Sequence, residues 1–327
     1  MINKLSKLVL KEIDLKFLMK ISGSRHLLPL YHTVSDIGLP HIKNLYTTKN
    51  TTEFRNDLDF FLKNYKSVAI DELINQLKEN NVREPIFNLT FDDGLKEIVE
   101  IIAPILLEKG VNATFFINSG FINNTSLFFR FKTSLLINKI KDKINSDNVI
   151  KQLKELLDGL SGETLTKKLL NITYNNKNIL DKAGEILEVD FEEFLKTEPF
   201  VDDDDIQWLI DKGFTIGAHS IDHPLFSDIT LDEQIRQAES SICVLNEKFE
   251  VAKNRLFAFP FSDNLVSDSF FKRINNEFPT YTFGTSGLNY DFEKLNFQRV
   301  PIENSSFGIS ELIKMYHLKF LLRKFQL

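Results

Sequence analysis

Two short motifs contain residues that could bind a metal ion. In FNLTFDDGLKE, Asp92 and Asp93 directly follow an apolar run and precede Gly94. Much later, GAHSIDHP contains His219 and His223, two of the six histidines in the chain. A spacing of four residues lets two imidazoles reach one ion if the chain turns helically after a strand. A carboxylate with two imidazoles suits a zinc-like divalent ion and leaves positions open for water and substrate.

The histidine pair also has a simpler interpretation. Taken alone, two histidines four residues apart are more often unrelated polar residues of a loop. No glutamate follows His219, so the pattern is not that of a zincin. The pair of aspartates at another predicted strand end nevertheless favours a metal site over two unrelated loop residues.

The segments around these motifs alternate between strand and helix patterns. Short apolar runs predict strands at 26–34, 84–93, 112–120, 214–220 and 255–263, and helical spacing appears at 51–65, 95–110, 204–213 and 231–249. This alternation predicts a parallel sheet covered by helices, either an open doubly wound sheet or a barrel. In both folds the chemistry gathers at the carboxyl ends of the strands.

Residues 121–200 interrupt the alternation. They are rich in lysine and asparagine, helical in pattern, and without a strong strand signal, which predicts an insertion between two βα units. Within it, LFFRFK (127–132) is aromatic and basic. This stretch could line a substrate groove or anchor the insertion to the rest of the protein.

Composition excludes some functions and leaves others open. The net charge of −6 gives no general attraction to nucleic acid. The single cysteine, Cys243, excludes an intramolecular disulfide and a cysteine metal cluster. The N-terminal segment lacks the apolar stretch of a secretory signal, so we expect a cytoplasmic protein, with the inner membrane surface as an alternative site. The basic, amphipathic segment 306–327 predicts a helix that packs on the body or, alternatively, contacts a membrane peripherally.

Three motifs in this order resemble a known family. TFDDG, HSIDH and FAFPF resemble the first three motifs of the polysaccharide deacetylases, the NodB-homology family or carbohydrate esterase family four. The N-terminal LPLYHTVSD resembles the poly-N-acetylglucosamine deacetylase-like branch, which has a YH strand there. The resemblance covers about 30–120 and 200–305.

This resemblance implies a fold and a division of the chain. The implied fold is α/β, a distorted (β/α)7 barrel with roughly seven strands, here with a helical insertion. We therefore expect a helical N-terminal extension over 1–25 and a barrel over 26–305, interrupted at about 121–200. An amphipathic helix over 306–327 completes the chain.

The resemblance also assigns roles to the motif residues. It implies that Asp93, His219 and His223 hold one divalent metal ion, for which zinc is the first choice. It implies that Asp92 is the general base. The third motif implies that the backbone N–H of Phe261 donates a hydrogen bond to the oxyanion.

The sequence indicates less directly which residue donates the proton and which residue holds the base, Asp92, in place by an ion pair (its tether). The YH branch implies that His32 is the general acid, although a hydrogen-bonded core histidine is the simpler interpretation, and His317 in MYHLKF is a rival. Arg299 in FQRVPIE could tether the base or form a surface ion pair. The sequence departs from the family at Ala258, where many members have arginine, and at Ser262, where many have glycine.

Together these features predict metal-dependent hydrolysis of an N-acetyl group on an amino sugar. The partner would be an N-acetylated glycan or glycolipid: a polysaccharide, or its glycolipid-linked or nucleotide-linked precursor. Two alternatives remain, a non-catalytic carbohydrate-binding relative and a hydrolase of another small amide on the same scaffold.

Overall fold

The computed structural model describes residue 10 and residues 12–143, 146–249, 255–303, 305 and 307–325. Its main sheet consists of β2 (Pro29–Tyr31), β5 (Leu89–Phe91), β6 (Ala113–Ile117), β7 (Thr215–Ala218), β8 (Arg255–Ala258), β9 (Thr280–Gly284), β11 (Asn296–Gln298) and β12 (Val300–Pro301). All neighbouring pairs among these strands are parallel, and β10 (Tyr290–Asp291) adds one antiparallel pairing to β11. The predicted parallel sheet is thus confirmed.

The sheet curls until its last strand meets its first. Only Arg299 separates β11 from β12. On one side of this residue β11 pairs with β9, and on the other side β12 pairs with β2. The segment 296–301, here called the seam strand, therefore closes the sheet into the distorted barrel that the sequence predicts.

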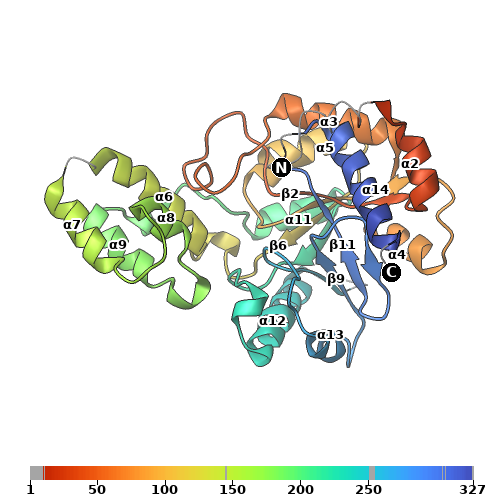
Figure 1. Cartoon of the computed structure of the whole chain (residues 1–327). Coiled ribbons are helices and arrows are strands. Elements are labelled where there is room, and N and C mark those ends of the chain that lie inside the picture. The colour runs from red at the N-terminus through yellow and green to blue at the C-terminus, as the bar shows by residue number, and fades with distance from the viewer. Residues whose placement is uncertain are drawn as a thin grey trace.

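Helices cover the outside of this curled sheet (Figure 1). They are α2 (Leu15–Ser22), α3 (Thr51–Asn64), α4 (Ile70–Lys78), α5 (Ala103–Lys109), α11 (Asp203–Asp211), α12 (Leu231–Phe249), α13 (Asp268–Ile274) and α14 (Ile309–Phe325). The helix expected over 95–110 begins instead as the π-helix η1 (Ile98–Ile102), because residues 95 and 96 pair with the segment 199–200 before the helix starts. No helix in the described ranges is long and apolar enough to cross a membrane.

Small elements complete the body. The strands β1 (His26–Leu27), β4 (Ile86–Phe87) and β3 (Lys66–Ser67) form a second parallel sheet with β4 in the middle. The short 3-10 turn η4 (Phe226–Asp228) also belongs to the body, whereas the turns η2 (Ile122–Asn124) and η3 (Tyr174–Asn176) lie within residues 121–200. His26, at the start of the strand predicted over 26–34, is buried in β1.

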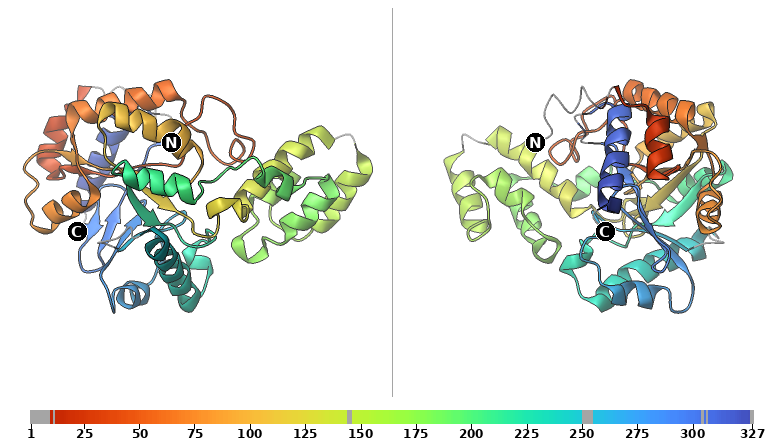
Figure 2. Two further views of the ribbon diagram at one scale, coloured as in Figure 1. Left: turned by 180° about the vertical axis from the view of Figure 1, so that it is seen from behind. Right: turned by 45° about the vertical axis from the view of Figure 1, so that its right-hand side comes forward.

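Residues 121–200 form a helical lobe that projects from the body (Figure 2). The lobe contains α6 (Phe129–Lys143), α7 (Asp147–Leu156), α8 (Leu165–Leu170), α9 (Ile179–Leu187) and α10 (Phe191–Leu195). Its buried leucines, isoleucines and phenylalanines make a core separate from that of the barrel. Since the lobe follows the carboxyl end of β6, it stands on the face of the barrel where strand ends meet.

The candidate metal and catalytic site

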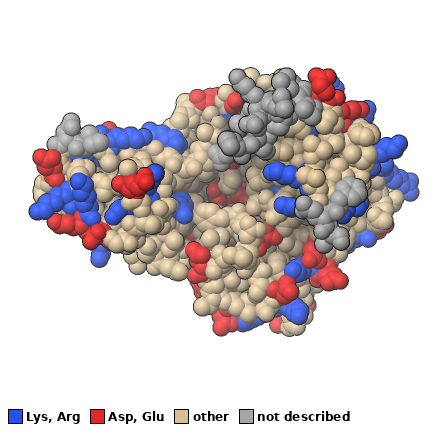
Figure 3. Space-filling model, viewed as in Figure 1, with Lys and Arg blue, Asp and Glu red and all other residues tan. Residues whose placement is uncertain are grey.

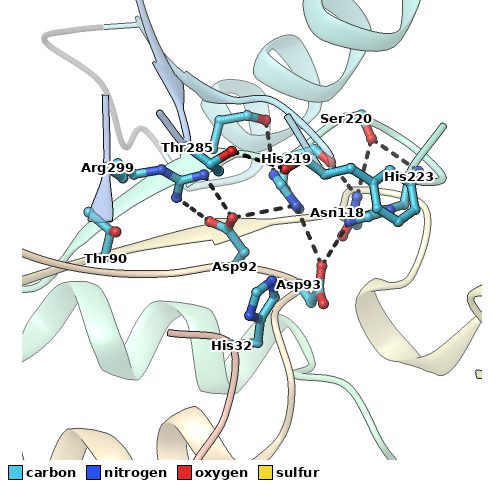
Figure 4. A network of polar contacts seen from close by, with 12 residues as sticks. His32, Thr90, Asp92, Asp93, Asn118, His219, Ser220, His223, Thr285 and Arg299 are labelled. Carbon is cyan, nitrogen blue, oxygen red and sulfur yellow. Dashed lines mark hydrogen bonds and ion pairs between the residues drawn. The ribbon is translucent and has the colours of Figure 1, made fainter. Parts of the chain in front are cut away.

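Polar side chains at the carboxyl ends of neighbouring strands face one another (Figure 4). Asp92 and Asp93 follow β5, His219 follows β7, and His32 follows β2. Arg299 reaches the same place from the seam strand. The parallel order of the strands brings these five residues together, although 267 positions separate the first from the last.

Three of them form a cluster that could hold a metal ion. Asp93, His219 and His223 are buried, and one ligand atom from each lies within 4.8 Å of the others. The Oδ1 atom of Asp93 is 3.1 Å from Nε2 of His223 and 3.5 Å from Nε2 of His219. One carboxylate oxygen thus faces two imidazole nitrogens, the donor set that suits a divalent ion with open positions.

Hydrogen bonds fix the ring of His219 and the backbone of His223. Nδ1 of His219 lies 2.9 Å from the carbonyl oxygen of Ala258, which can only accept, so this nitrogen carries the proton and Nε2 keeps its lone pair. The turn between the histidines is capped by Ser220, whose Oγ accepts the N–H of His223 at 3.0 Å. The Asn118 amide in turn donates to Ser220 Oγ and to the His219 carbonyl oxygen.

The backbone around this cluster is strained. Asp93, Ser220, His223 and Phe261 have φ values of 77°, 68°, 63° and 59°, in the left-handed region that non-glycine residues seldom adopt. Each such residue costs on the order of 1–3 kcal/mol, and such strain concentrates at functional sites. Two buried atoms of the cluster, Oδ1 of Asp93 and Nδ1 of His223, also have no hydrogen-bond partner. An ion on Asp93 Oδ1 would satisfy the first of these atoms, so the cluster fits a bound metal.

Asp92 points away from Asp93 and pairs with the seam strand. Its two oxygens accept from Nη1 and Nη2 of Arg299 at 2.6 and 2.8 Å. Arg299 is fully buried, and its Nε donates to the Gly284 carbonyl oxygen at 3.2 Å. Burial alone would raise the pKa of Asp92, but Arg299 and His219 lower it below the usual value. The structure therefore places Arg299 in a buried bidentate pair and not in a surface ion pair.

His32 forms a second ionic pair at the rim of the site. Its Nδ1 lies 2.6 Å from Oε2 of Glu303, and its backbone N–H donates to Oε1 of the same carboxylate at 2.9 Å. The His32 side chain is 30% exposed, whereas that of Glu303 is 3% exposed. Burial alone would lower the pKa of His32, but Glu303, with Asp93 and Asp92, raises it to about 9.

The sequence did not indicate Glu303 as a site residue. It follows Arg299 by four positions, and residues an even number apart lie on the same side of a strand. This spacing was the one signal that could have revealed it. His317, the rival proton donor, lies instead in α14, where Nδ1 is 3.0 Å from Ser22 Oγ, and it does not line the cleft.

The site opens into a cleft of about 440 Å³ between the barrel and the helical lobe. Figure 3 shows a hollow there with acidic side chains on its floor. The barrel contributes Asp92, Asp93 and Phe261, and the loop after β2 contributes Tyr46. The lobe contributes Phe128, Arg130 and Leu170, so LFFRFK lines the cleft while its other phenylalanines, Phe129 and Phe131, are buried in the lobe core.

Comparison with known proteins agrees with this geometry. The family model described as "Polysaccharide deacetylase" matches residues 79–276. No curated protein matches the chain. Among solved structures, the Streptococcus pyogenes deacetylase PplD in complex with acetate is similar, with a TM-score of 0.57 and 13% identity, covering 88% of this chain and 97% of PplD. IcaB from Ammonifex degensii has a TM-score of 0.57 and 14% identity, covering 90% of this chain and 97% of IcaB.

A third similar structure is the polysaccharide deacetylase BC0361 from Bacillus cereus. It has a TM-score of 0.51 and 15% identity, covering 89% of this chain and 68% of BC0361. At these low identities the three structures establish the fold, while the family model extends over more than half of the chain.

Proposed function

The chain belongs to the polysaccharide deacetylase family, and we propose that it is a metal-dependent hydrolase that removes the acetyl group from an N-acetylated amino sugar. The observation that carries this proposal is the buried cluster of Asp93, His219 and His223 beside Asp92, at the floor of an open cleft. A metal site, an ionised base and a protonated acid around one cleft are what amide hydrolysis requires.

Asp93, His219 and His223 would hold the ion, with zinc as our proposed metal because two imidazoles and one carboxylate match its preferences. When bound there, the ion would lower the pKa of a coordinated water and polarise the acetamide carbonyl. The cluster is buried, Ala258 orients the ring of His219 and Ser220 holds the backbone of His223, so little rearrangement is needed to form the site.

Asp92 acts as the general base in this proposal. Its lowered pKa keeps it ionised at neutral pH, so it can take a proton from the attacking water. Arg299 grips both of its oxygens and fixes the direction of the carboxylate. The adjacent Asp93 faces the histidines, so the two neighbouring aspartates serve different partners.

His32 acts as the general acid and protonates the leaving amine. Its raised pKa of about 9 keeps it charged at neutral pH, and its partly exposed ring lines the cleft. Glu303 orients the ring by occupying Nδ1, so Nε2 is the nitrogen left to donate. This arrangement supports membership of the branch with an N-terminal YH strand.

The backbone N–H of Phe261 is proposed to stabilise the oxyanion. Phe261 lies at the mouth of the cleft, its ring is 4.7 Å from that of His223, and its N–H has no hydrogen-bond partner among the described residues. A free donor in a fixed, strained turn is suited to meet charge that develops only in the transition state.

Acetate release tests the proposal. The protein would be assayed with N-acetylated oligosaccharides, glycolipid precursors and nucleotide sugars, before and after treatment with a chelator. We expect acetate from at least one substrate, loss of release with the chelator, recovery with zinc, and loss in Asp92→Asn. Binding of a sugar without any release would favour a non-catalytic carbohydrate-binding relative. Release from a small amide, but from no sugar, would favour the alternative hydrolase.

A further inference from the structure

The helical lobe places a cation in the wall of the cleft. Arg130 lies in the first turn of α6 and lines the cleft with Phe128 and Leu170. Its Nη1 donates to the carbonyl oxygen of Leu170 at 2.6 Å. A guanidinium has five N–H donors, so most of its hydrogen-bonding capacity is left for another partner.

Arg130 has no carboxylate partner within 4.0 Å in the described part of the chain. The other partly or fully buried arginines of the described ranges differ, because each pairs with a carboxylate: Arg55 with Glu108, Arg255 with Glu239 and Arg299 with Asp92. Burial lowers the pKa of Arg130, and the carboxylate of Asp228, which is not paired with it, offsets this only in part. A cation in the first turn is also disfavoured by the helix dipole, so neither its pairing nor its place in the helix explains the residue.

Aromatic rings hold the guanidinium over the cleft. Its central carbon is 5.0 Å from the ring centroid of Phe129 and 5.7 Å from that of Phe261. The ring of Phe261 in turn is 4.7 Å from that of His223, in the metal cluster. Phe261 thus lies against both the cation and an imidazole of the metal cluster, and all three line the same cleft.

We propose that Arg130 binds an anionic group, a phosphate or a carboxylate, carried by the N-acetylated substrate next to the sugar that is deacetylated. An arginine matches both groups, because its planar fork donates two parallel hydrogen bonds to their oxygens. This inference rests on the proposed function and narrows its substrate to an acidic glycan or a phosphorylated sugar precursor. In this proposal the barrel carries the catalytic residues, and Arg130 of the lobe selects substrates that carry a negative charge.

Substrate pairs test this proposal. The kcat/KM for deacetylation would be measured with neutral di-N-acetylchitobiose, with N-acetylglucosamine 1-phosphate and with N-acetylmuramic acid. We expect the wild type to prefer one of the two acidic substrates, and which one it prefers distinguishes phosphate from carboxylate. Arg130→Ala should lower kcat/KM for that substrate roughly 10- to 100-fold, and lower it much less for the neutral one. Arg130→Lys should recover part of the preference, since it keeps the charge but loses the fork.

Lys182→Ala is the matched control, because Lys182 is an exposed cation on α9 of the same lobe. It should leave all three values unchanged, and melting temperatures would verify that each variant is folded. Equal loss for acidic and neutral substrates in Arg130→Ala would overturn the proposal and make Arg130 a structural link between lobe and barrel.

A binding measurement separates this proposal from the proposed function. Calorimetry with glucosamine 1-phosphate and glucosamine needs no turnover. Stronger binding of the phosphorylated sugar by the wild type, lost in Arg130→Ala, supports the anion site even if no substrate releases acetate. Equal binding of the two sugars by the wild type, or equal affinity for glucosamine 1-phosphate in wild type and Arg130→Ala, overturns the anion site even if deacetylation is observed.

Discussion

Two ionic pairs flank the cleft, and they differ in depth and in charge. The pair of Asp92 with Arg299 is buried on both sides, at 3% and 0% side-chain exposure. The pair of His32 with Glu303 is 30% exposed on the histidine side. In the first the tether is a cation and lowers the pKa of a carboxylate, and in the second it is an anion and raises the pKa of an imidazole.

Both tethers come from one short segment. Arg299 lies within the seam strand and Glu303 just after it, four positions later. One segment therefore lowers the pKa of the candidate base, Asp92, and raises the pKa of the candidate acid, His32. Such a separation lets one group stay ionised and the other stay protonated at the same pH. The comparison implies that damage to either pair should affect chemistry, and that damage to the buried pair should destabilise the fold more than damage to the rim pair.

The largest effect is expected from breaking the buried pair. Arg299→Met leaves Asp92 buried without its cation, so we expect a loss of about 3–5 kcal/mol in the free energy of unfolding. The pKa of Asp92 should rise, which would move the acidic limb of the kcat/KM profile to higher pH. Urea unfolding and a pH–rate profile measure the two effects.

A second substitution sharpens that result. The double variant Arg299→Met with Asp92→Asn removes both charges and should regain part of the lost stability without regaining activity. If Arg299→Met alone were as stable as the wild type, the buried pair would not have the structural role assigned to it.

Removing the candidate acid should reduce turnover without unfolding the protein. In His32→Gln we expect kcat to fall roughly 10²- to 10⁴-fold, the range typical of a general acid, because the leaving amine then lacks its proton donor. The melting temperature should fall by less than in Arg299→Met, since the ring is partly exposed. His317→Gln is the matched comparison, and a loss of turnover there with none in His32→Gln would make His317 the acid.

A milder change at the rim should move the pH profile. Glu303→Gln keeps the size and one acceptor oxygen but removes the charge, so the pKa of His32 should fall from about 9 towards 6.5. Because the raised pKa reflects stabilisation of charged His32, the wild type gains this stability fully below pH about 6.5 and loses it as pH rises through about 9. The alkaline limb of the pH–activity profile should move to lower pH by as much as the pKa of His32 falls. An unshifted limb would exclude His32 as the titrating acid.

The smallest effect is expected at the turn between the histidines. Ser220→Ala removes the acceptor of the His223 N–H, which should cost about 1 kcal/mol of stability and weaken zinc binding roughly 10-fold or more. Competition with a chelating dye measures the affinity. The control is Ser241→Ala, because Ser241 is also a buried serine but lies within α12, outside the metal cluster. This substitution should leave zinc affinity unaltered.

The part of the site that lies directly at strand ends could be predicted from the sequence. The residues directly after the apolar runs are Asp92, Asp93 and His219. Parallel strands bring such positions to one edge of the sheet, so the alternation of apolar runs and helices was enough to predict that these residues lie close together. The turn that returns His223 to the cluster depends on left-handed backbone at Ser220 and His223, which no local propensity predicts.

Other parts of the site could not be predicted without knowing how the barrel closes. Arg299 was considered as a tether, but its burial follows from the seam between β9 and β2, strands that lie far apart in the sequence. Glu303 carries no motif, and only its distance of four positions from Arg299 placed it on the same side. In the lobe, the aromatic and basic LFFRFK favoured anchoring slightly over lining the cleft, whereas in the structure Phe128 and Arg130 line the cleft and Phe129 and Phe131 are buried in the lobe core.

The seam strand has a consequence for how the protein becomes active during folding. It joins residues near position 300 to residues near position 30, a contact between distant parts of the chain that folding theory places among the slow ones. The same contact delivers Arg299 and Glu303 to their partners. Closure of the barrel and the setting of both pKa values are therefore one kinetic event, so recovery of activity during refolding should follow the slowest structural phase and never precede it.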